Sequence, residues 1–344
     1  MIPLAPKIKL VLKYLLFLSI GLGLLYLAFK NTDPHQMLRD LKNADYKWII
    51  LSLLVSVIGC IIRAHRWNML IHPLGFRPKL KNTYAALMAG YLANLAVPRI
   101  GEVTRCESLT RTEKIPFNIL LGTVISERIV DLIMLCLMLL LTAILKIHVL
   151  GKFILIKVIY PLKDKVYLAL HSTLFIGGVL AFGAGLIVLL VYFWKRQPTS
   201  GSSKIKNLLK GVKEGVKSIR KIKSVSWFVF HTLMIWIVYF LTSYLCFFAL
   251  PATSGLGIIA GIFCVSIGGI GMSAPVQGGI GAYHIMISVG LTLFAIPFRD
   301  GNTYATIVHT SQTLLVLVTG ALSIVYLFIS NRKSINDGPA TPSK

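Results

Sequence analysis

The sequence has little charge, and most of that charge is of one sign. Of its 344 residues only 12 are acidic, against 36 lysines and arginines, and charged residues make up 14% of the chain. Hydrophobic residues make up 56%, and the mean hydropathy is +0.76. This composition lies far from that of soluble globular domains and is typical of a polytopic membrane protein.

Common signatures of metal, nucleotide and esterase chemistry are also missing. None of the five cysteines forms a C-x-x-C pair and most lie in apolar runs, which favours buried thiols over disulfides or metal ligands. The sequence contains no G-x-x-x-x-G-K-[ST], H-E-x-x-H or G-x-S-x-G motif. We therefore expect no cofactor and no metal site, and no hydrolysis of ATP, zinc-dependent hydrolysis or serine-esterase activity.

No polar stretch is long enough to form a soluble domain. The longest polar connection, 195–223, is too short to bury a core of its own, so any function belongs to the membrane part or to a partner. The net charge of +24 could indicate nucleic acid, but no soluble module displays it. Anionic lipid is the better match, and we expect no nucleic-acid partner.

Six apolar runs reach the roughly 20 residues that a membrane-spanning helix needs. Lys7, Lys9 and Lys13 lie around the start of the first run and no cleavage site follows it, so we expect an uncleaved first helix. The sequence predicts an all-α polytopic membrane protein with one domain over 1–335 and a short polar tail at 336–344. The runs are roughly 10–29, 47–67, 116–145, 168–194, 225–250 and 304–330.

Basic residues indicate which connections face the cytoplasm. The segment 195–223 holds ten lysines and arginines and one glutamate, which assigns it to the cytoplasmic side. Its apolar residues recur at helical spacing, which favours an interfacial helix on an anionic leaflet over a solvated connector. A second basic connection follows the second run and contains Arg63, Arg66, Arg77, Lys79 and Lys81. Arg63 and Arg66, at the end of the second helix, are interpreted as interface anchors. We expect a protein of the inner (plasma) membrane with both termini in the cytoplasm.

The parity of crossings makes the segment 82–97 unusual. Both basic connections lie on one side, and the runs 116–145 and 168–194 already supply two crossings between them. The segment 82–97 must therefore enter from the cytoplasm, stop and return. Pro98 lacks an amide donor and disfavours helix before it, and Gly101 permits a turn.

A second interrupted segment lies near the other end of the chain, at 268–284. Pro275 is followed by Gly278, Gly279 and Gly281, and this segment enters from the opposite face. Two interrupted apolar segments that approach the midplane from opposite sides indicate an inverted repeat with a site where they meet. Irregular backbone at membrane depth is tolerated where it is buried or lines a cavity. The alternative is a pair of ordinary surface loops.

Ionisable residues inside the run 116–145 are candidates for function. Glu127 and Asp131 are four apart on one helix face, and Arg128 precedes Asp131 by three. A charge at bilayer depth costs about 2.5 to 3.5 kcal/mol even on insertion scales, and it suggests a functional site. The alternative is a structural ion pair that fixes this helix to the first re-entrant segment.

A second charged cluster adjoins the first break. An arginine fork matches a phosphodiester, and a glutamate can hold an ammonium group or a sugar hydroxyl. We interpret Glu107 and Arg111 as a solvated surface pair, and His284 and His309 as packed residues without a role. The candidate headgroup-binding residues are Arg99, Glu102, Arg105, Glu127, Arg128 and Asp131, and the candidate gating residues are Pro98, Gly101, Pro275, Gly278, Gly279 and Gly281.

Four motifs, in order, resemble a known membrane family. They are Arg66-Trp67, the stretch NLAVPRIGEVTR at 94–105, ERIVD at 127–131 and PVQGGIGA at 275–282. Together they resemble the lysylphosphatidylglycerol synthase transmembrane region, also called the flippase-like or UPF0104 family. The resemblance covers about residues 10–330. The ordered combination is specific, although each motif alone is weak.

This resemblance implies translocation of a lipid headgroup. Bifunctional members carry a separate soluble domain that makes the aminoacyl-lipid, and its absence here argues against aminoacyl transfer by this chain alone. The expected cargo is an anionic or glycosylated lipid. Two alternatives remain: a membrane transferase with Glu102 or Asp131 as general base, and a non-catalytic partner of a lipid synthase or glycosyltransferase.

Overall fold

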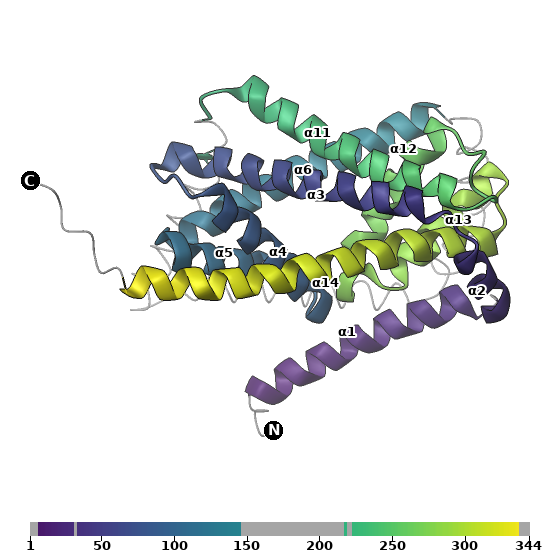
Figure 1. Cartoon of the computed structure of the whole chain (residues 1–344), viewed down its shortest axis with the longest axis horizontal. Coiled ribbons are helices and arrows are strands. Elements are labelled where there is room, and N and C mark those ends of the chain that lie inside the picture. The colour runs from purple at the N-terminus through teal and green to yellow at the C-terminus, as the bar shows by residue number, and fades with distance from the viewer. Residues whose placement is uncertain (1–5, 31–32, 146–216, 219–221, 337–344) are drawn as a thin grey trace, which may run out of the picture. The chain divides into compact units, whose positions relative to one another are not determined.

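The computed structural model describes residues 6–30, 33–145, 217–218 and 222–336, and within these ranges it contains helices and no strand (Figure 1). The prediction of an all-α membrane protein is confirmed. The helices of the first part are α1 (Pro6–Phe29), α2 (Pro34–Lys42), α3 (Tyr46–Ile71), η1 (His72–Leu74), α4 (Leu80–Ala96), α5 (Gly101–Glu113) and α6 (Phe117–Leu145). The second part contains α11 (Val225–Leu245), η4 (Cys246–Ala249), α12 (Ile258–Ser273), η5 (Gln277–Gly279), α13 (Ala282–Leu291), η6 (Thr292–Phe294) and α14 (Phe298–Asn336).

Four helical stretches of the described residues are long and apolar enough to cross a bilayer. They correspond to the expected runs 47–67, 116–145, 225–250 and 304–330, and α1 covers the run 10–29. The run 168–194 and most of the expected interfacial helix lie outside the described residues. The four stretches are Tyr46–Leu74, Phe117–Leu145, Val225–Ala249 and Phe298–Asn331.

Helices α3 and α11 pack closely because α3 presents small residues to its neighbour. A Cβ added to Gly59 would lie 2.5 Å from Cγ1 of Val238, so only glycine fits at this contact. One turn earlier, Ser56 Oγ lies 3.1 Å from Thr242 Oγ1, and Ser52 Oγ donates to the Thr242 carbonyl at 2.9 Å. Small residues that bring helix backbones together are characteristic of membrane helix interfaces.

The first re-entrant segment is a helical hairpin made of α4 and α5. Val97, before Pro98, is extended (φ −132°, ψ 124°) and ends α4, as the proline predicts. The turn itself uses Arg99, which adopts a left-handed φ of 62°. Gly101 was expected to supply the turn, but it serves the packing of the two helices. A Cβ on Gly101 would lie 2.1 Å from the carbonyl oxygen of Gly90.

The second re-entrant segment, α12–η5–α13, turns as its glycines predict. Gly278, Gly279 and Gly281 all have positive φ, at 56°, 78° and 77°. These values lie in the region that favours glycine, so each residue has a conformational reason to be there. The α1 backbone also packs on this turn, because a Cβ on Gly281 would lie 2.5 Å from the amide nitrogen of Leu25.

Both hairpins pack along α14, one on each half (Figure 1). Tyr326 donates to Asn82 of α4, while Ser288 of α13 lies against Gly301. Between these contacts the two turns meet: a Cβ on Gly278 would lie 2.8 Å from Leu95 of α4. The hairpins thus approach each other from opposite ends of α14, which supports the inverted-repeat interpretation.

Two hydrophobic cores flank this meeting point, one beside each hairpin. The first packs α3 against α4, α5 and α6, and the second packs η4, α12 and α13 against the first half of α14. Trp67 is the largest fully buried side chain of the first core, and Tyr304 and Phe247 are the largest of the second. Each hairpin is therefore fixed by a core of its own.

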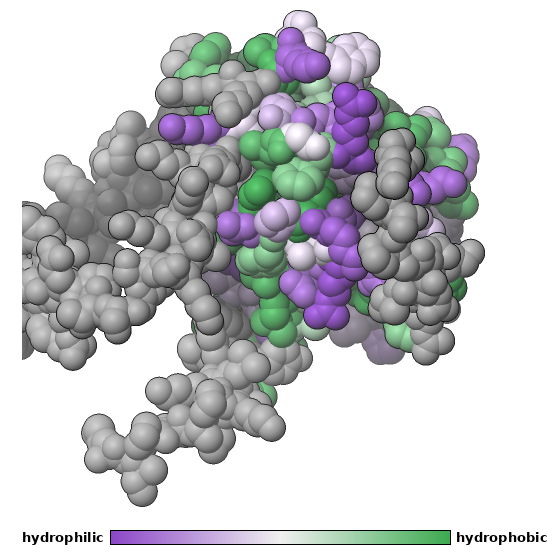
Figure 2. Space-filling view, turned by 90° about the vertical axis from the view of Figure 1, so that its left-hand side faces the viewer, coloured by the Kyte–Doolittle hydropathy of each residue, from purple (hydrophilic) through white to green (hydrophobic). Residues whose placement is uncertain are grey.

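The end of the molecule at which α3 ends and α4 begins carries exposed basic residues. Figure 2 faces this end and shows hydrophilic side chains gathered between apolar ones. The exposed basic residues of its loops and helix ends are Arg77, Lys79, Lys81, Arg111 and Lys114. A cytoplasmic orientation of this end stays a prediction from the positive-inside rule.

Candidate functional site

Helix α6 carries the acidic residues of the site in its first half. Glu127 lies roughly 15 Å along the axis from Phe117 at a rise of about 1.5 Å per residue, inside one of the helices that are long and apolar enough to cross a bilayer. Its side chain is fully buried, and that of Asp131, one turn on, is 18% exposed. Such carboxylates need partners, because an unpaired buried charge is costly.

Two arginines of α3 supply most of those partners. Arg63 places Nε 2.9 Å and Nη2 2.8 Å from Glu127 Oε1, and the same Nη2 lies 2.7 Å from Asp131 Oδ2. Arg66, fully buried, places Nη2 2.6 Å from Asp131 Oδ1. Arg63 also donates to the hydroxyl of Tyr239 on α11. The two carboxylates of α6 are thus held by two guanidinium groups of α3.

A third arginine connects the first hairpin to the same centre. Arg105 of α5 places Nη1 3.1 Å from Glu127 Oε2, and its guanidinium lies 4.8 Å from the ring centroid of Trp67. This contact fixes α5 to α6, which is the structural role that the sequence left open as an alternative. The aromatic face adds a favourable contact for the buried cation.

The centre holds more arginines than carboxylates. Among pairs whose nitrogen and oxygen atoms lie within 4 Å of each other, four arginines face three carboxylates, which leaves one excess positive charge. The arginines are Arg63, Arg66, Arg105 and Arg128, and the carboxylates are Glu102, Glu127 and Asp131. Several of its buried polar atoms have no hydrogen-bond partner among the described residues, and such atoms carry a cost of about 1 to 3 kcal/mol each. They are Arg66 Nε, Arg105 Nε, Arg105 Nη2 and Glu102 Oε2.

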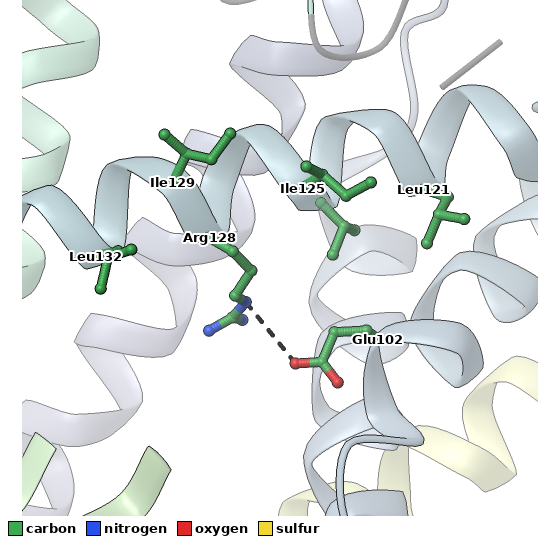
Figure 3. A pocket seen from close by; sticks show the side chains of 7 residues that line it. Glu102, Leu121, Ile125, Arg128, Ile129 and Leu132 are labelled. Atoms are coloured by element: carbon green, nitrogen blue, oxygen red, sulfur yellow. Dashed lines mark ion pairs between the residues drawn. The ribbon is translucent and has the colours of Figure 1, made fainter. Parts of the chain in front are cut away.

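The fourth arginine and Glu102 lie in a groove at the edge of this centre. Figure 3 shows Arg128 of α6 and Glu102 of α5 pointing toward each other across it. Their closest atoms, Arg128 Nε and Glu102 Oε1, are 3.8 Å apart, and the side chains are 42% and 29% exposed. The groove has a volume of about 280 Å³, and its other walls are apolar. They are formed by Leu121, Val124, Ile125, Ile129 and Leu132.

The structure brings together five of the six expected headgroup-binding residues: Glu102, Arg105, Glu127, Arg128 and Asp131. Arg99 is exposed outside the ion network, and its Nη2 donates to the Ser273 carbonyl at 3.2 Å. It therefore joins the turns of the two hairpins. The expected surface pair is present, with Arg111 Nε 2.7 Å from Glu107 Oε1.

The interpretation of Arg63 and Arg66 as interface anchors is wrong. Helix α3 continues to Ile71, so both arginines lie inside the helix and turn toward the carboxylates of α6. A signal was available in the sequence. Arg63 and Arg66 share a face of one apolar helix at a spacing of three. Glu127 and Asp131 share a face of another at a spacing of four, so the positive face of the first helix could pair with the negative face of the second.

The described residues contain no group of three or more histidine, cysteine or acidic side chains placed to hold a metal ion. The histidines that were expected to be packing residues do meet, with the rings of His284 and His309 5.0 Å apart. His309 Nε2 also lies 2.8 Å from the carbonyl oxygen of Gly278, at the second turn.

Comparison with known proteins gives one family and one curated relative. A UPF0104 membrane protein of Methanocaldococcus jannaschii is 28% identical over 120 residues, which are 34% of this chain and 35% of the relative. The match thus spans about a third of each protein. No solved structure matches the chain. The family described as the lysylphosphatidylglycerol synthase TM region matches residues 11–320, nearly the whole chain. This chain is therefore a member of the lysylphosphatidylglycerol synthase TM region family.

Proposed function

We propose that this protein is a lipid translocase that moves a phospholipid or glycolipid headgroup between leaflets through the space beside the two hairpin turns. The observation that carries the proposal is the Glu102–Arg128 pair. It lies in an otherwise apolar groove beside a helix that is long and apolar enough to cross a bilayer, and it is backed by a buried centre with one excess positive charge. A negatively charged headgroup would neutralise that excess.

The geometry of the pair suits reversible binding. At 3.8 Å the two ions are separated by more than a direct hydrogen bond, and both side chains are partly exposed. A phosphate could take a bidentate contact from Arg128, and Glu102 could accept from an ammonium group or a sugar hydroxyl. The ion pairs of Glu127 and Asp131 with Arg63, Arg66 and Arg105 are shorter and more buried, which suits them to a supporting role.

Membership of the family supports a lipid-related membrane function. The family description names a lysylphosphatidylglycerol synthase, whose product is a phosphatidylglycerol that carries a lysyl group and so presents amines beside its phosphate. The proposed cargo, an anionic or glycosylated lipid, fits the arginine-rich centre. A lipid synthase or glycosyltransferase as a protein partner belongs to the same proposal, because a translocase needs an enzyme that makes its cargo.

The proposal is tested with purified protein reconstituted into liposomes that contain a fluorescent phosphatidylglycerol in one leaflet. A translocase changes the sidedness of the lipid and leaves its mass unchanged. Glu102→Gln and Arg128→Gln should each slow this exchange about tenfold, which corresponds to the loss of roughly 1.4 kcal/mol. Glu107→Gln and Arg111→Gln are the matched controls, because they alter an ion pair on the exposed face of α5.

The same assay separates the two other functions. A transferase would change the mass of the lipid when an aminoacyl or glycosyl donor is present, and a non-catalytic partner would change neither mass nor sidedness. Equal exchange by empty liposomes and by liposomes with the wild-type protein, for phosphatidylglycerol and for glycosylated lipids, would contradict the translocase.

A further inference from the structure

A second groove lies on the other side of the second hairpin turn, between α1, α13 and α14. Its volume is about 620 Å³, within the range of pockets that hold small organic ligands. None of its lining residues is charged, in contrast to the groove at Glu102 and Arg128. They are Leu22, Leu25, Tyr26, Phe29, Ile280, His284, Thr306, His309, Thr310, Thr313 and Leu314.

The polar side chains of this groove form a compact group in apolar walls. His284 of α13 and His309 of α14 lie ring to ring, and Phe29 of α1 lies 5.6 Å from His284. Thr306 lies three residues before His309 and Thr313 four residues after it, so these threonines share its side of α14. Thr306 donates its hydroxyl hydrogen to the Asn302 carbonyl at 2.8 Å, which leaves its oxygen free to accept a hydrogen bond from a ligand.

His284 is a buried polar residue of the groove, and one of its two ring nitrogens has no partner among the described residues. The residue is 4% exposed, and its Nδ1 is enclosed without a hydrogen-bond partner among them. An unpaired acceptor is tolerated better than an unpaired N–H group, so the neutral ring carries its proton on Nε2. That N–H group is a donor for a ligand in the groove.

The groove is held open by close backbone packing at its floor. Leu24 and Leu25 of α1 lie directly on Gly281, where even one added carbon would approach Leu25 N to 2.5 Å. Because α1 rests on this point, it stays apart from His309 and from the threonines of α14. The groove is therefore a feature of the helix packing.

The depth of the groove restricts what can occupy it. Leu314 is at the middle of the 34-residue apolar stretch of α14, and the polar group at 306–313 lies within about 13 Å of it at 1.5 Å per residue. A charged headgroup at this depth would find no counter-ion in the lining and would lose its hydration. The surrounding apolar helices make the bilayer itself the source of a ligand.

We propose that this groove binds a neutral glycerolipid of the diacylglycerol type. Its ester carbonyl accepts from His284 Nε2, its free hydroxyl donates to the oxygen of Thr306, and its acyl chain lies along Leu22, Leu25 and Leu314. Such a lipid brings hydrogen-bonding groups to membrane depth without charge. The site requires no transport by the first groove, so the proposal does not depend on the proposed function.

The test is photo-crosslinking of the full chain in lipid nanodiscs that contain a trace of a diazirine-bearing diacylglycerol. Labelled peptides are identified by mass spectrometry. The label should saturate and should map to 22–29 and 306–314. His284→Phe removes the donor but keeps a planar ring, and Leu314→Trp narrows the mouth at a side chain that is 55% exposed, so folding is not at risk there. Each should lower labelling about fivefold, the effect of losing one hydrogen bond or a comparable contact.

Leu137→Trp, at a 52% exposed position on α6, is the matched control and should leave the labelling unchanged. Labelling spread evenly over the exposed apolar face of α6 would show that the lipid is only part of the surrounding bilayer, and it would overturn the proposal. Equal labelling of the groove by a diazirine-bearing phosphatidylglycerol would overturn the assignment to a neutral lipid.

Discussion

Arg66 Nη2 lies 2.6 Å from Asp131 Oδ1, although the two residues are 65 positions apart. Together with the contacts of Arg63, this bond ties α3 to α6 through side chains that are largely buried. Buried ion pairs of this kind are no better than well-packed apolar groups for stability, but removing one partner leaves an uncompensated charge. The stability of the centre therefore depends on keeping each of these buried carboxylates paired with its arginines.

Glu127→Gln should destabilise the protein strongly. The carboxylate is fully buried and lies within 4 Å of Arg63, Arg66, Arg105 and Arg128. We expect the free energy of unfolding in detergent to fall by about 3 to 5 kcal/mol. Glu107→Gln, which removes an exposed partner of Arg111, should change it by less than about 1 kcal/mol. Similar losses in the two variants would show that the centre is not a stabilising unit.

A second substitution should partly restore the first. Arg105→Met in the Glu127→Gln background removes a cation that has lost its partner, so we expect a gain of about 1 kcal/mol or more over Glu127→Gln alone. Arg111→Met in the same background should restore nothing. The measurement is a double-mutant cycle of unfolding free energies, and strict additivity of the Arg105 and Glu127 substitutions would contradict the contact between them.

Gly101→Ala should force α4 and α5 apart. The new methyl group would meet the Gly90 carbonyl oxygen at 2.1 Å and the Asn94 side chain at 2.7 Å. Overpacking of this degree costs about 1 to 3 kcal/mol, which a melting curve in detergent would detect. Gly23→Ala in α1 is the control, since a Cβ there meets no atom within 4 Å. An unchanged melting temperature for Gly101→Ala would mean that the hairpin is looser than described.

Arg128→Lys should impair the proposed exchange of lipid between leaflets, whereas Arg99→Lys should have little effect. A lysine keeps the charge of Arg128 but cannot reproduce its planar fork on a phosphate. Arg99 donates to one backbone carbonyl, a contact that an ammonium group can also make. The liposome sidedness assay compares the two at matched folded yield. Full activity of Arg128→Lys would leave Arg128 as a structural partner of Glu102 and Asp131.

The spans and the turns could be predicted because their signals are local. Apolar runs mark α3, α6, α11 and α14, the proline at 98 ends α4, and Gly278, Gly279 and Gly281 supply the positive φ values of the second turn. The role of Gly101 could not be read in this way. Its reason is the carbonyl of Gly90 on a neighbouring helix, and nothing in the local sequence distinguishes packing from turning.

The partners within the site were harder to predict than its members. Glu127, Arg128 and Asp131 stand out because they are charged residues in an apolar run. Arg63 and Arg66 lie near a basic loop, so the positive-inside rule gave them a simpler explanation. Only the packing of α3 on α6 shows that they turn inward, and that packing joins residues 64 and more positions apart.

Each hairpin turn holds the end of one helix and the beginning of another. The carbonyl end of α4 and the amide end of α5 meet at the first turn, and those of α12 and α13 meet at the second. Helix ends carry opposite partial charges of about half a unit, negative at the carbonyl end and positive at the amide end. Within each hairpin these charges offset each other, so the backbone adds almost no net field to the middle of the molecule. The electrostatic sign of that region is consequently decided by side chains, and the loss of a single arginine is enough to cancel its excess positive charge.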